Sequence, residues 1–206
     1  MGQTNQRAVI FDYGGVLVKT VDYTPRHAWD NRLNLPRGSV ERVAHGSESW
    51  RQAQTGQLAL ADYWKDVARQ LGLDETDVAQ FARDFYSGDQ PDAVLLAYLR
   101  ELRQRGHTIA LLSNASPALR GELAAFEMTD LFDVIVASCE IGVMKPDARA
   151  YQAVLNQLGR LPAEAIFIDD LPANIAGARA VGLRGVLYTP GMDLPAALEP
   201  LLLTNA

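Results

Sequence analysis

The stretch AIFIDDLPANIAGA, residues 165–178, places two adjacent carboxylates, Asp169 and Asp170, at the end of an apolar run. Neighbouring carboxylates repel each other, which raises a pKa unless a cation compensates their charge. A hard divalent cation such as Mg²⁺, held by a few carboxylates and a backbone carbonyl, is the usual source of that compensation. A solvated pair of turn acids is the alternative, and it fits poorly beside four apolar neighbours.

Similar apolar runs recur along the chain and read as buried strands at 8–11 (AVIF), 108–113 (TIALLS), 132–138 (FDVIVAS) and 185–188 (GVLY). Helical segments separate them. The segment 91–106 predicts an amphipathic helix whose buried face contains Val94, Leu95, Tyr98 and Leu102. Apolar strands that alternate with helices indicate an α/β protein, a Rossmann-like parallel sheet covered on both faces.

Residues 24–88 differ from this pattern, because they are polar and helical, with helix starts at Thr24-Pro25 and at Ser39. We therefore expect an α/β core formed by residues 1–18 and 89–206, with an α-helical cap, residues 19–88, inserted after the first strand. In open α/β folds the ligand site lies beyond the carboxyl ends of the strands, where such an insertion sits.

Polar residues stand at those strand ends. Asp12 precedes two glycines, Ser113 and Asn114 follow the second strand, and Lys145 precedes a Pro-Asp helix start. Each has an ordinary structural interpretation when taken alone: a turn aspartate, a helix cap and a solvated lysine. Their order along the chain, an aspartate, then a serine, a lysine and a pair of aspartates, is far more specific than any single motif.

Together these motifs resemble the haloacid dehalogenase-like hydrolase superfamily, and the helical insertion is similar to that family's cap. The resemblance implies that Asp12 attacks phosphorus and forms an aspartyl-phosphate. Ser113 and Asn114 would bind the phosphoryl group, and Lys145 would offset the negative charge. A carboxylate nucleophile can approach an anionic substrate only where such positive charge is supplied.

The same resemblance implies a Mg²⁺ site formed by Asp12, the backbone carbonyl of Gly14, Asp169 and Asp170, with Asn174 orienting the acids or a metal-bound water. The resemblance is closest to the branch that contains the phosphatase domain of soluble epoxide hydrolases and a bacterial sugar-1-phosphate phosphatase. We therefore expect a Mg²⁺-dependent phosphatase that acts on a small phosphorylated metabolite.

The chain departs from the family pattern at Gly14, where most of these phosphatases carry a second aspartate that exchanges protons with the leaving group and with water. Proton transfer by a positioned side chain contributes about 10² to 10⁴ in rate. Its loss predicts an enzyme that is slow or restricted to good leaving groups, unless a cap residue takes its place.

Two other functions compete with this interpretation. A 2-haloacid dehalogenase needs neither a metal nor a second acid, but its site resembles Ser-x-Asn where this chain has Asp169-Asp170, and it carries threonine in place of Val16. A non-catalytic binding or regulatory protein would have kept the fold and lost activity with Gly14. The retained nucleophile and metal acids argue against that second alternative.

Substrate choice is expected to depend on the cap. Arg26 and His27 are the first candidates for a phosphate contact or a substitute proton donor. For most polar and aromatic cap residues, helix packing is the commoner role. The full set of candidates is Tyr23, Arg26, His27, Trp29, His45, Trp50, Arg51, Tyr63 and Trp64.

Composition limits the remaining possibilities. The 206 residues include 19 Lys and Arg and 25 Asp and Glu, a net charge of −6 without a basic cluster, which disfavours nucleic-acid binding. The single cysteine, Cys139, excludes an internal disulfide framework. Because no apolar run approaches a membrane span, we expect a cytoplasmic protein that contacts no membrane. The sequence leaves the oligomeric state open.

Overall fold

The structure is a computed structural model that describes residues 6–203. Within those residues the central sheet has five parallel strands in the order β5-β4-β1-β6-β7. Their bounds are Ala8–Phe11 (β1), Thr108–Ser113 (β4), Val134–Ala137 (β5), Ala165–Asp169 (β6) and Arg184–Leu187 (β7). The expected parallel α/β core is therefore confirmed.

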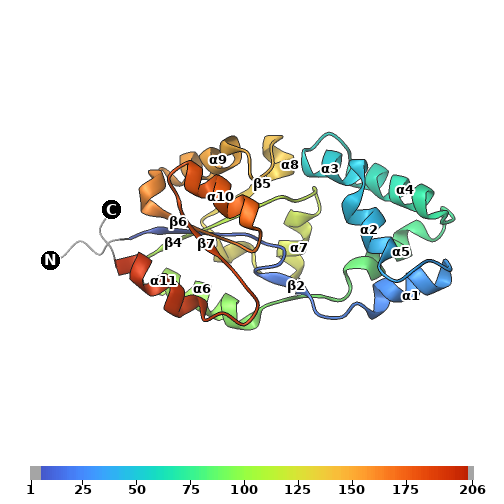
Figure 1. Ribbon diagram of the computed structural model, residues 1–206, viewed down its shortest axis with the longest axis horizontal. Coiled ribbons are helices and arrows are strands. Elements are labelled where there is room, and N and C mark those ends of the chain that lie inside the picture. The colour runs from blue at the N-terminus through green and yellow to red at the C-terminus, as the bar shows by residue number, and fades with distance from the viewer. Residues whose placement is uncertain (1–5, 204–206) are drawn as a thin grey trace.

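Successive side chains of a strand point to opposite faces, and the central strand shows why both faces are covered. Val9 and Phe11 belong to one hydrophobic cluster, whereas Ala8 and Ile10 belong to another. The first cluster packs against α6 (Ala93–Gln104), α7 (Leu119–Ala125) and α11 (Leu194–Leu203). The second packs against α9 (Ala148–Leu158) and α10 (Pro172–Ala180), as Figure 1 shows.

Three short helical segments complete the core: the 3₁₀ turns Thr129–Leu131 and Pro162–Glu164, and α8 (Ser138–Ile141). The predicted buried face of α6 needs one correction. Leu95, Tyr98 and Leu102 are buried, but Val94 is 77% exposed. Val94 lies in the first turn, where the chain has just left β3, and the helix turns this residue away from the sheet.

A separate group of helices lies at one end of the molecule (Figure 1). It consists of α1 (Thr24–Arg32), α2 (Ser39–Gly46), α3 (Glu48–Gln54), α4 (Leu60–Leu71) and α5 (Val78–Tyr86). Aromatic side chains form its core, in which Trp29, Trp64 and Phe81 pack edge to face. We refer to residues 24–86 as the helical insertion.

A short antiparallel ribbon carries the chain into and out of the helical insertion. It pairs β2 (Val18–Thr20) with β3 (Asp89–Pro91). The sequence did not predict this ribbon, and the expected domain boundaries, after residue 18 and before residue 89, fall at it. Residues 1–5 and 204–206 of the expected core lie outside the described part of the chain.

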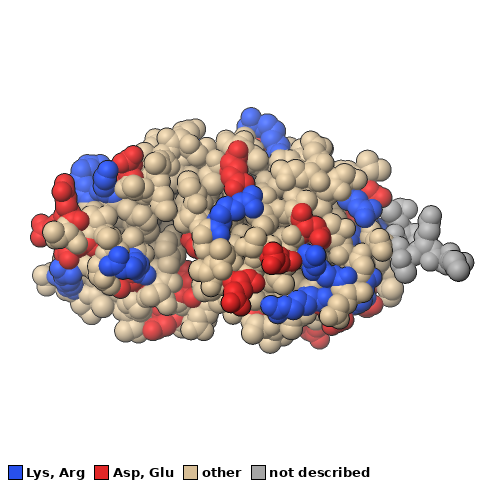
Figure 2. All heavy atoms as spheres, turned by 180° about the vertical axis from the view of Figure 1, so that it is seen from behind, with Lys and Arg blue, Asp and Glu red and all other residues tan. Residues whose placement is uncertain are grey.

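The surface has mixed charge. On the face drawn in Figure 2, lysine and arginine side chains alternate with aspartate and glutamate, and the described residues form no continuous basic patch there. None of the helices within residues 6–203 combines the length and the apolar character needed to span a bilayer.

Candidate active site

The strand order brings the predicted polar residues together. β1 lies between β4 and β6, so that Asp12, Ser113 and Asp169 follow or end three adjacent strands at the same edge of the sheet. Carboxylate oxygens of Asp12, Asp169 and Asp170 lie within 4.8 Å of one another. This edge is the place at which open α/β sheets bind ligands.

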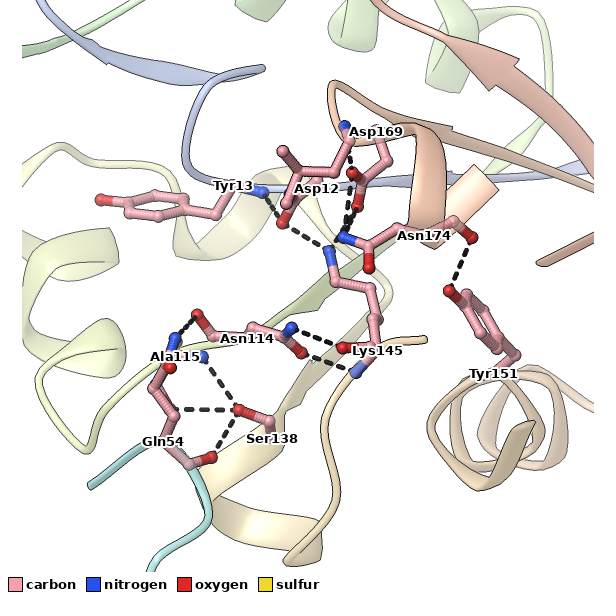
Figure 3. Close-up of polar contacts among 11 residues, drawn as sticks. Asp12, Tyr13, Gln54, Asn114, Ala115, Ser138, Lys145, Tyr151, Asp169 and Asn174 are labelled. Carbon is pink, nitrogen blue, oxygen red and sulfur yellow. Dashed lines mark hydrogen bonds and ion pairs between the residues drawn. The ribbon is translucent and has the colours of Figure 1, made fainter. Parts of the chain in front are cut away.

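Lys145 lies between two of these acids (Figure 3). Its Nζ is 2.8 Å from Oδ1 of Asp12 and 2.7 Å from Oδ2 of Asp169, and the residue is only 4% exposed. The Asn114 amide positions the backbone of Lys145 from both sides. Asn114 Nδ2 donates to the Lys145 carbonyl at 2.9 Å, and the Lys145 N–H donates to Asn114 Oδ1 at 2.7 Å.

Asp169 is fully buried, and both of its oxygens have protein donors. Oδ1 accepts hydrogen bonds from the Leu171 backbone N–H at 2.8 Å and from Asn174 Nδ2 at 3.0 Å. Oδ2 accepts from Lys145 and from the same Asn174 nitrogen. Tyr151 in turn donates its hydroxyl to the Asn174 carbonyl at 2.7 Å. Asp169 therefore anchors Lys145 and Asn174 and keeps no oxygen free of a donor.

Asp12 and Asp170, unlike Asp169, have carboxylate oxygens that accept no hydrogen bond from another described residue. Oδ1 of Asp12 accepts from Lys145 and from the Tyr13 N–H at 2.7 Å, but Oδ2 has no hydrogen-bond donor among residues 6–203. The Asp170 carboxylate accepts no hydrogen bond from any other described residue, and neither does the backbone carbonyl of Gly14. Three residues at the mouth of the sheet thus have oxygens that accept no hydrogen bond from the described residues.

The electrostatics of the metal-free protein reflect this arrangement. Burial raises the pKa of Asp12 to about 7, because its effect outweighs the attraction of Lys145. Burial, and then the nearby charge of Asp169, also raise the pKa of Asp170. Carboxylate and carbonyl oxygens whose negative charge is not balanced by protein groups are the hard ligands that Mg²⁺ prefers. The residues present therefore fit a divalent cation.

The two glycines after Asp12 have different environments. Gly15 has a φ of +80°, and a Cβ added there would collide with the Asp170 carboxylate. Gly14 is exposed, and a Cβ added there would meet no atom within 4 Å. The close approach of the first strand's loop to Asp170 therefore depends on Gly15, while Gly14 has open space where a side chain would begin.

Two adjoining cavities, of about 570 and 470 Å³, lie over this edge of the sheet. Both are lined by Gly14, Ser113 and Asp170 from the core and by His45 and Trp50 from the helical insertion. The Ser113 hydroxyl, 3% exposed at the end of β4, has no hydrogen-bond partner among the described residues. It is therefore free to donate to a bound anion.

The cap residues predicted as substrate-binding candidates lie in the larger cavity, in the core of the helical insertion or on its surface. Tyr23, Arg26, His45 and Trp50 line the larger cavity. Trp29, Tyr63 and Trp64 form the core of the helical insertion, and Arg51 is an exposed partner of Glu48.

Arg26 and His27, the first candidates for a phosphate contact, both hydrogen-bond to other protein groups. The buried Arg26 guanidinium donates to the Phe85 carbonyl, Glu41 and Asp89. His27 lines a separate hollow with Thr24, Ala28, Asn31 and Arg37, and its Nε2 accepts a hydrogen bond from Arg37. The structure thus brings Arg26 to the cavity with its charge balanced by two carboxylates, and it does not bring His27 there.

Sequence reasoning also missed several residues around the site. Gln54 Nε2 donates to the Asn114 carbonyl at 2.8 Å, and Ser138 Oγ donates to the Gln54 carbonyl at 2.6 Å, so α3 contacts the core beside Lys145 (Figure 3). Glu122 on α7 lines the larger cavity with its carboxyl half-buried. These residues carry no spacing signal, because their proximity arises only from tertiary packing.

Comparisons with known proteins agree with this architecture. The model of the family described as haloacid dehalogenase-like hydrolase matches residues 6–182. A sesquiterpene phosphatase of Aspergillus oryzae is 32% identical over 191 residues, which is 92% of this chain and 93% of that protein. An (S)-2-haloacid dehalogenase of a Pseudomonas strain is 31% identical over 192 residues, 87% of this chain and 83% of that protein.

Solved structures show the same fold. A crystal structure of a haloacid dehalogenase-family enzyme from Bacteroides thetaiotaomicron, in complex with magnesium and inorganic phosphate, superimposes with a TM-score of 0.79. The alignment covers 94% of this chain and 100% of that chain, at 21% identity. The α/β core and the position of the helical insertion are thus shared with an enzyme of this family.

Proposed function

The chain belongs to the haloacid dehalogenase-like hydrolase family, and from this premise we propose that it is a Mg²⁺-dependent phosphatase of small phosphorylated metabolites. The observation that carries the proposal is the set of oxygens without hydrogen-bond donors on three residues, Asp12, Gly14 and Asp170, beside the buried Lys145. Such a set has room for a divalent cation and, next to it, for an anionic phosphoryl group.

Asp12, Asp170 and the Gly14 carbonyl would hold Mg²⁺, with Asp169 behind them. The bound cation supplies positive charge that offsets the charge of the phosphoryl group. Asp169 has four donor contacts, so we assign it the role of holding Lys145 and Asn174 in place.

The reaction proceeds in two halves at Asp12. A carboxylate oxygen of Asp12 forms a bond to phosphorus while the bond to the leaving oxygen breaks, which produces an aspartyl-phosphate. Lys145 balances the negative charge beside Asp12, and the free Ser113 hydroxyl donates to a phosphoryl oxygen. Water then attacks phosphorus, releases inorganic phosphate and regenerates the Asp12 carboxylate.

The dehalogenase alternative is weaker. It has support from the Pseudomonas relative, whose name describes a haloacid substrate. However, a departing halide is an anion, and the Asp170 carboxylate beside Asp12 would repel it, since no described cation is paired with Asp170. Val16, which stands where a dehalogenase is expected to carry threonine, has no hydroxyl and is completely buried.

A substrate screen tests the proposal. Purified protein would be incubated with a panel of phosphorylated metabolites, with Mg²⁺ and after exhaustive chelation, and released phosphate measured. Hydrolysis should require the cation and disappear in Asp12→Asn, which retains the shape of the side chain without its charge. Turnover that survives chelation, or release of chloride from 2-chloropropionate above a heat-killed control, would replace this proposal with the dehalogenase.

A further inference from the structure

His45, the penultimate residue of α2, lies at the junction of the two cavities. It lines the smaller one together with Asp12, Gly14 and Lys145, and it lines the larger one as well. The other histidines of the chain, His27 and His107, line neither of these cavities. The helical insertion therefore brings one imidazole to the space that contains the nucleophile and the glycine without an acid.

Packing surrounds the His45 ring but leaves its nitrogens available. The ring centroid lies 5.2 Å from that of Trp50, 5.1 Å from that of Phe85 in an edge-to-face arrangement, and 6.2 Å from that of Tyr86. No residue of the described chain hydrogen-bonds to the imidazole, and His45 is more than a third exposed and lines both cavities. An oriented polar ring without a protein partner is suited to contact a ligand.

Burial of the ring and the nearby Arg26 cation favour the neutral form of His45. The aromatic neighbours remove water from the ring, and the Arg26 cation of α1 adds repulsion, which together lower the pKa of His45 to about 4. The acids that line the two cavities are Glu41 of α2, Asp89 of β3, Glu122 of α7, and Asp12 and Asp170 of the core, and their other cations are Lys19 and Lys145. At neutral pH the imidazole is therefore a proton acceptor.

We propose that His45 accepts the proton of the water that hydrolyses the aspartyl-phosphate, the task for which Gly14 offers no carboxylate. The inference rests on the proposed phosphatase function. The water oxygen forms a bond to phosphorus, its proton moves to an imidazole nitrogen, and the bond between phosphorus and Asp12 breaks. The electron pair of that bond returns to the Asp12 carboxylate, and His45 then releases the proton to solvent.

Formation and hydrolysis of the aspartyl-phosphate consequently differ in whether His45 can assist them. A neutral imidazole has no proton to give to a departing alkoxide without becoming an anion, so the first half continues to depend on a good leaving group. The second half uses the imidazole as a base. Removal of His45 should therefore slow breakdown of the aspartyl-phosphate and leave its formation almost unchanged.

Rapid-quench kinetics with an aryl phosphate would separate the two halves, because its good leaving group makes formation of the aspartyl-phosphate fast. In His45→Ala we expect steady-state turnover to fall by roughly 10² to 10⁴, with a burst of released phenolate and a larger fraction of acid-trapped phosphoenzyme. Added imidazole should restore part of the rate. His45→Phe retains the ring packing without the nitrogens and should show the same defect.

His107→Gln serves as the matched control, because it removes a histidine before the amino end of β4, opposite to the site, and should turn over like the wild type. Wild-type turnover in both His45 variants, or a slower burst in place of a slower steady state, would overturn the assignment of His45. A wild-type protein that releases phosphate from no substrate in the presence of Mg²⁺ would overturn the proposed function itself.

Discussion

Lys145 and Asp12 form an ion pair of 2.8 Å whose two members are 4% and 7% exposed. The lysine enters from the loop before α9, whereas the aspartate follows the central strand of the sheet. Water hardly screens this pair, so the Lys145 cation favours the charged form of the Asp12 carboxylate. The site can therefore carry an ionised nucleophile only because a distant loop delivers a cation to it.

Lys145→Met should destabilise the metal-free protein by about 3 to 5 kcal/mol at pH 8, because it leaves buried carboxylates without their cation. Its loss also removes an attraction that lowers the pKa of Asp12, so the folded pKa moves further above the unfolded value of 3.8. A group with a raised folded pKa destabilises the fold as pH rises towards that pKa. The deficit should thus be smaller at pH 5.

Urea denaturation of both proteins at pH 5 and pH 8 would measure this difference. Lys65→Met is the control, because Lys65 and its partner Asp62 are exposed and their pair contributes at most about 1 kcal/mol. An equal deficit for Lys145→Met at the two pH values would show that lost packing, and not unpaired charge, causes the instability.

Binding of Mg²⁺ should tighten as pH rises towards about 7 and then level off. The pKa of Asp12 is raised to about 7 in the metal-free protein, so the cation must displace a proton below that pH. We expect the affinity to fall about tenfold for each pH unit below 7. Titration calorimetry in two buffers of different ionisation enthalpy would detect the released proton.

Asp170→Asn should weaken Mg²⁺ binding at every pH, because it replaces a charged oxygen ligand with a neutral one. Asp62→Asn, at an exposed position of the helical insertion, is the control that should bind as the wild type does. Affinity that is independent of pH, with no proton released, would remove Asp12 from the set of metal ligands.

Gly14→Asp should increase the hydrolysis of alkyl phosphates by up to ~10² while it changes aryl phosphate hydrolysis much less. The exposed backbone at Gly14 has room for a Cβ, and Gly14 is not among the glycines with positive φ. The ratio of kcat/KM for matched alkyl and aryl substrates is the measurement, accompanied by thermal unfolding. An unchanged ratio in a stable variant would show that proton delivery does not limit the first half-reaction.

Gly15→Ala, at the neighbouring position, is expected to destabilise the fold and to weaken the metal site. A φ of +80° disfavours alanine, and the added Cβ would collide with the Asp170 carboxylate. We expect a loss of about 1 to 3 kcal/mol in unfolding free energy together with weaker Mg²⁺ binding. Thermal unfolding and metal titration would measure these two effects, and a variant that matched the wild type in both would contradict the geometry of this loop.

The core could be predicted from the sequence because its signals are local. Apolar runs end in Asp12, Ser113 and Asp169, and parallel strands bring such ends to one edge whatever the details of packing. The position of Lys145 followed only from the resemblance, since nothing in VMKPDARAY shows that its side chain turns towards two acids.

The helical insertion was less predictable. His27 stands close to the first motif in sequence, yet α1 turns it to another surface, while His45 on α2 reaches the cavity. Aromatic packing between residues far apart in the chain decides which histidine faces the cavity, and this packing cannot be predicted from the spacing of residues in one sequence. The function of Asn114 was also hidden, because its amide holds the Lys145 loop through contacts between residues far apart in the chain.

The central position of β1 has a consequence for how the molecule is made. Its two neighbours in the sheet are β4, which begins at Thr108, and β6, which ends at Asp169. A ribosome that adds about 5 to 20 residues per second exposes AVIF for seconds before the first partner strand emerges. During that time the helical insertion is synthesised, whereas the apolar segment AVIF has no partner strand. Asp12 is thus translated more than 100 residues before its neighbours in the site, Lys145 and Asp169.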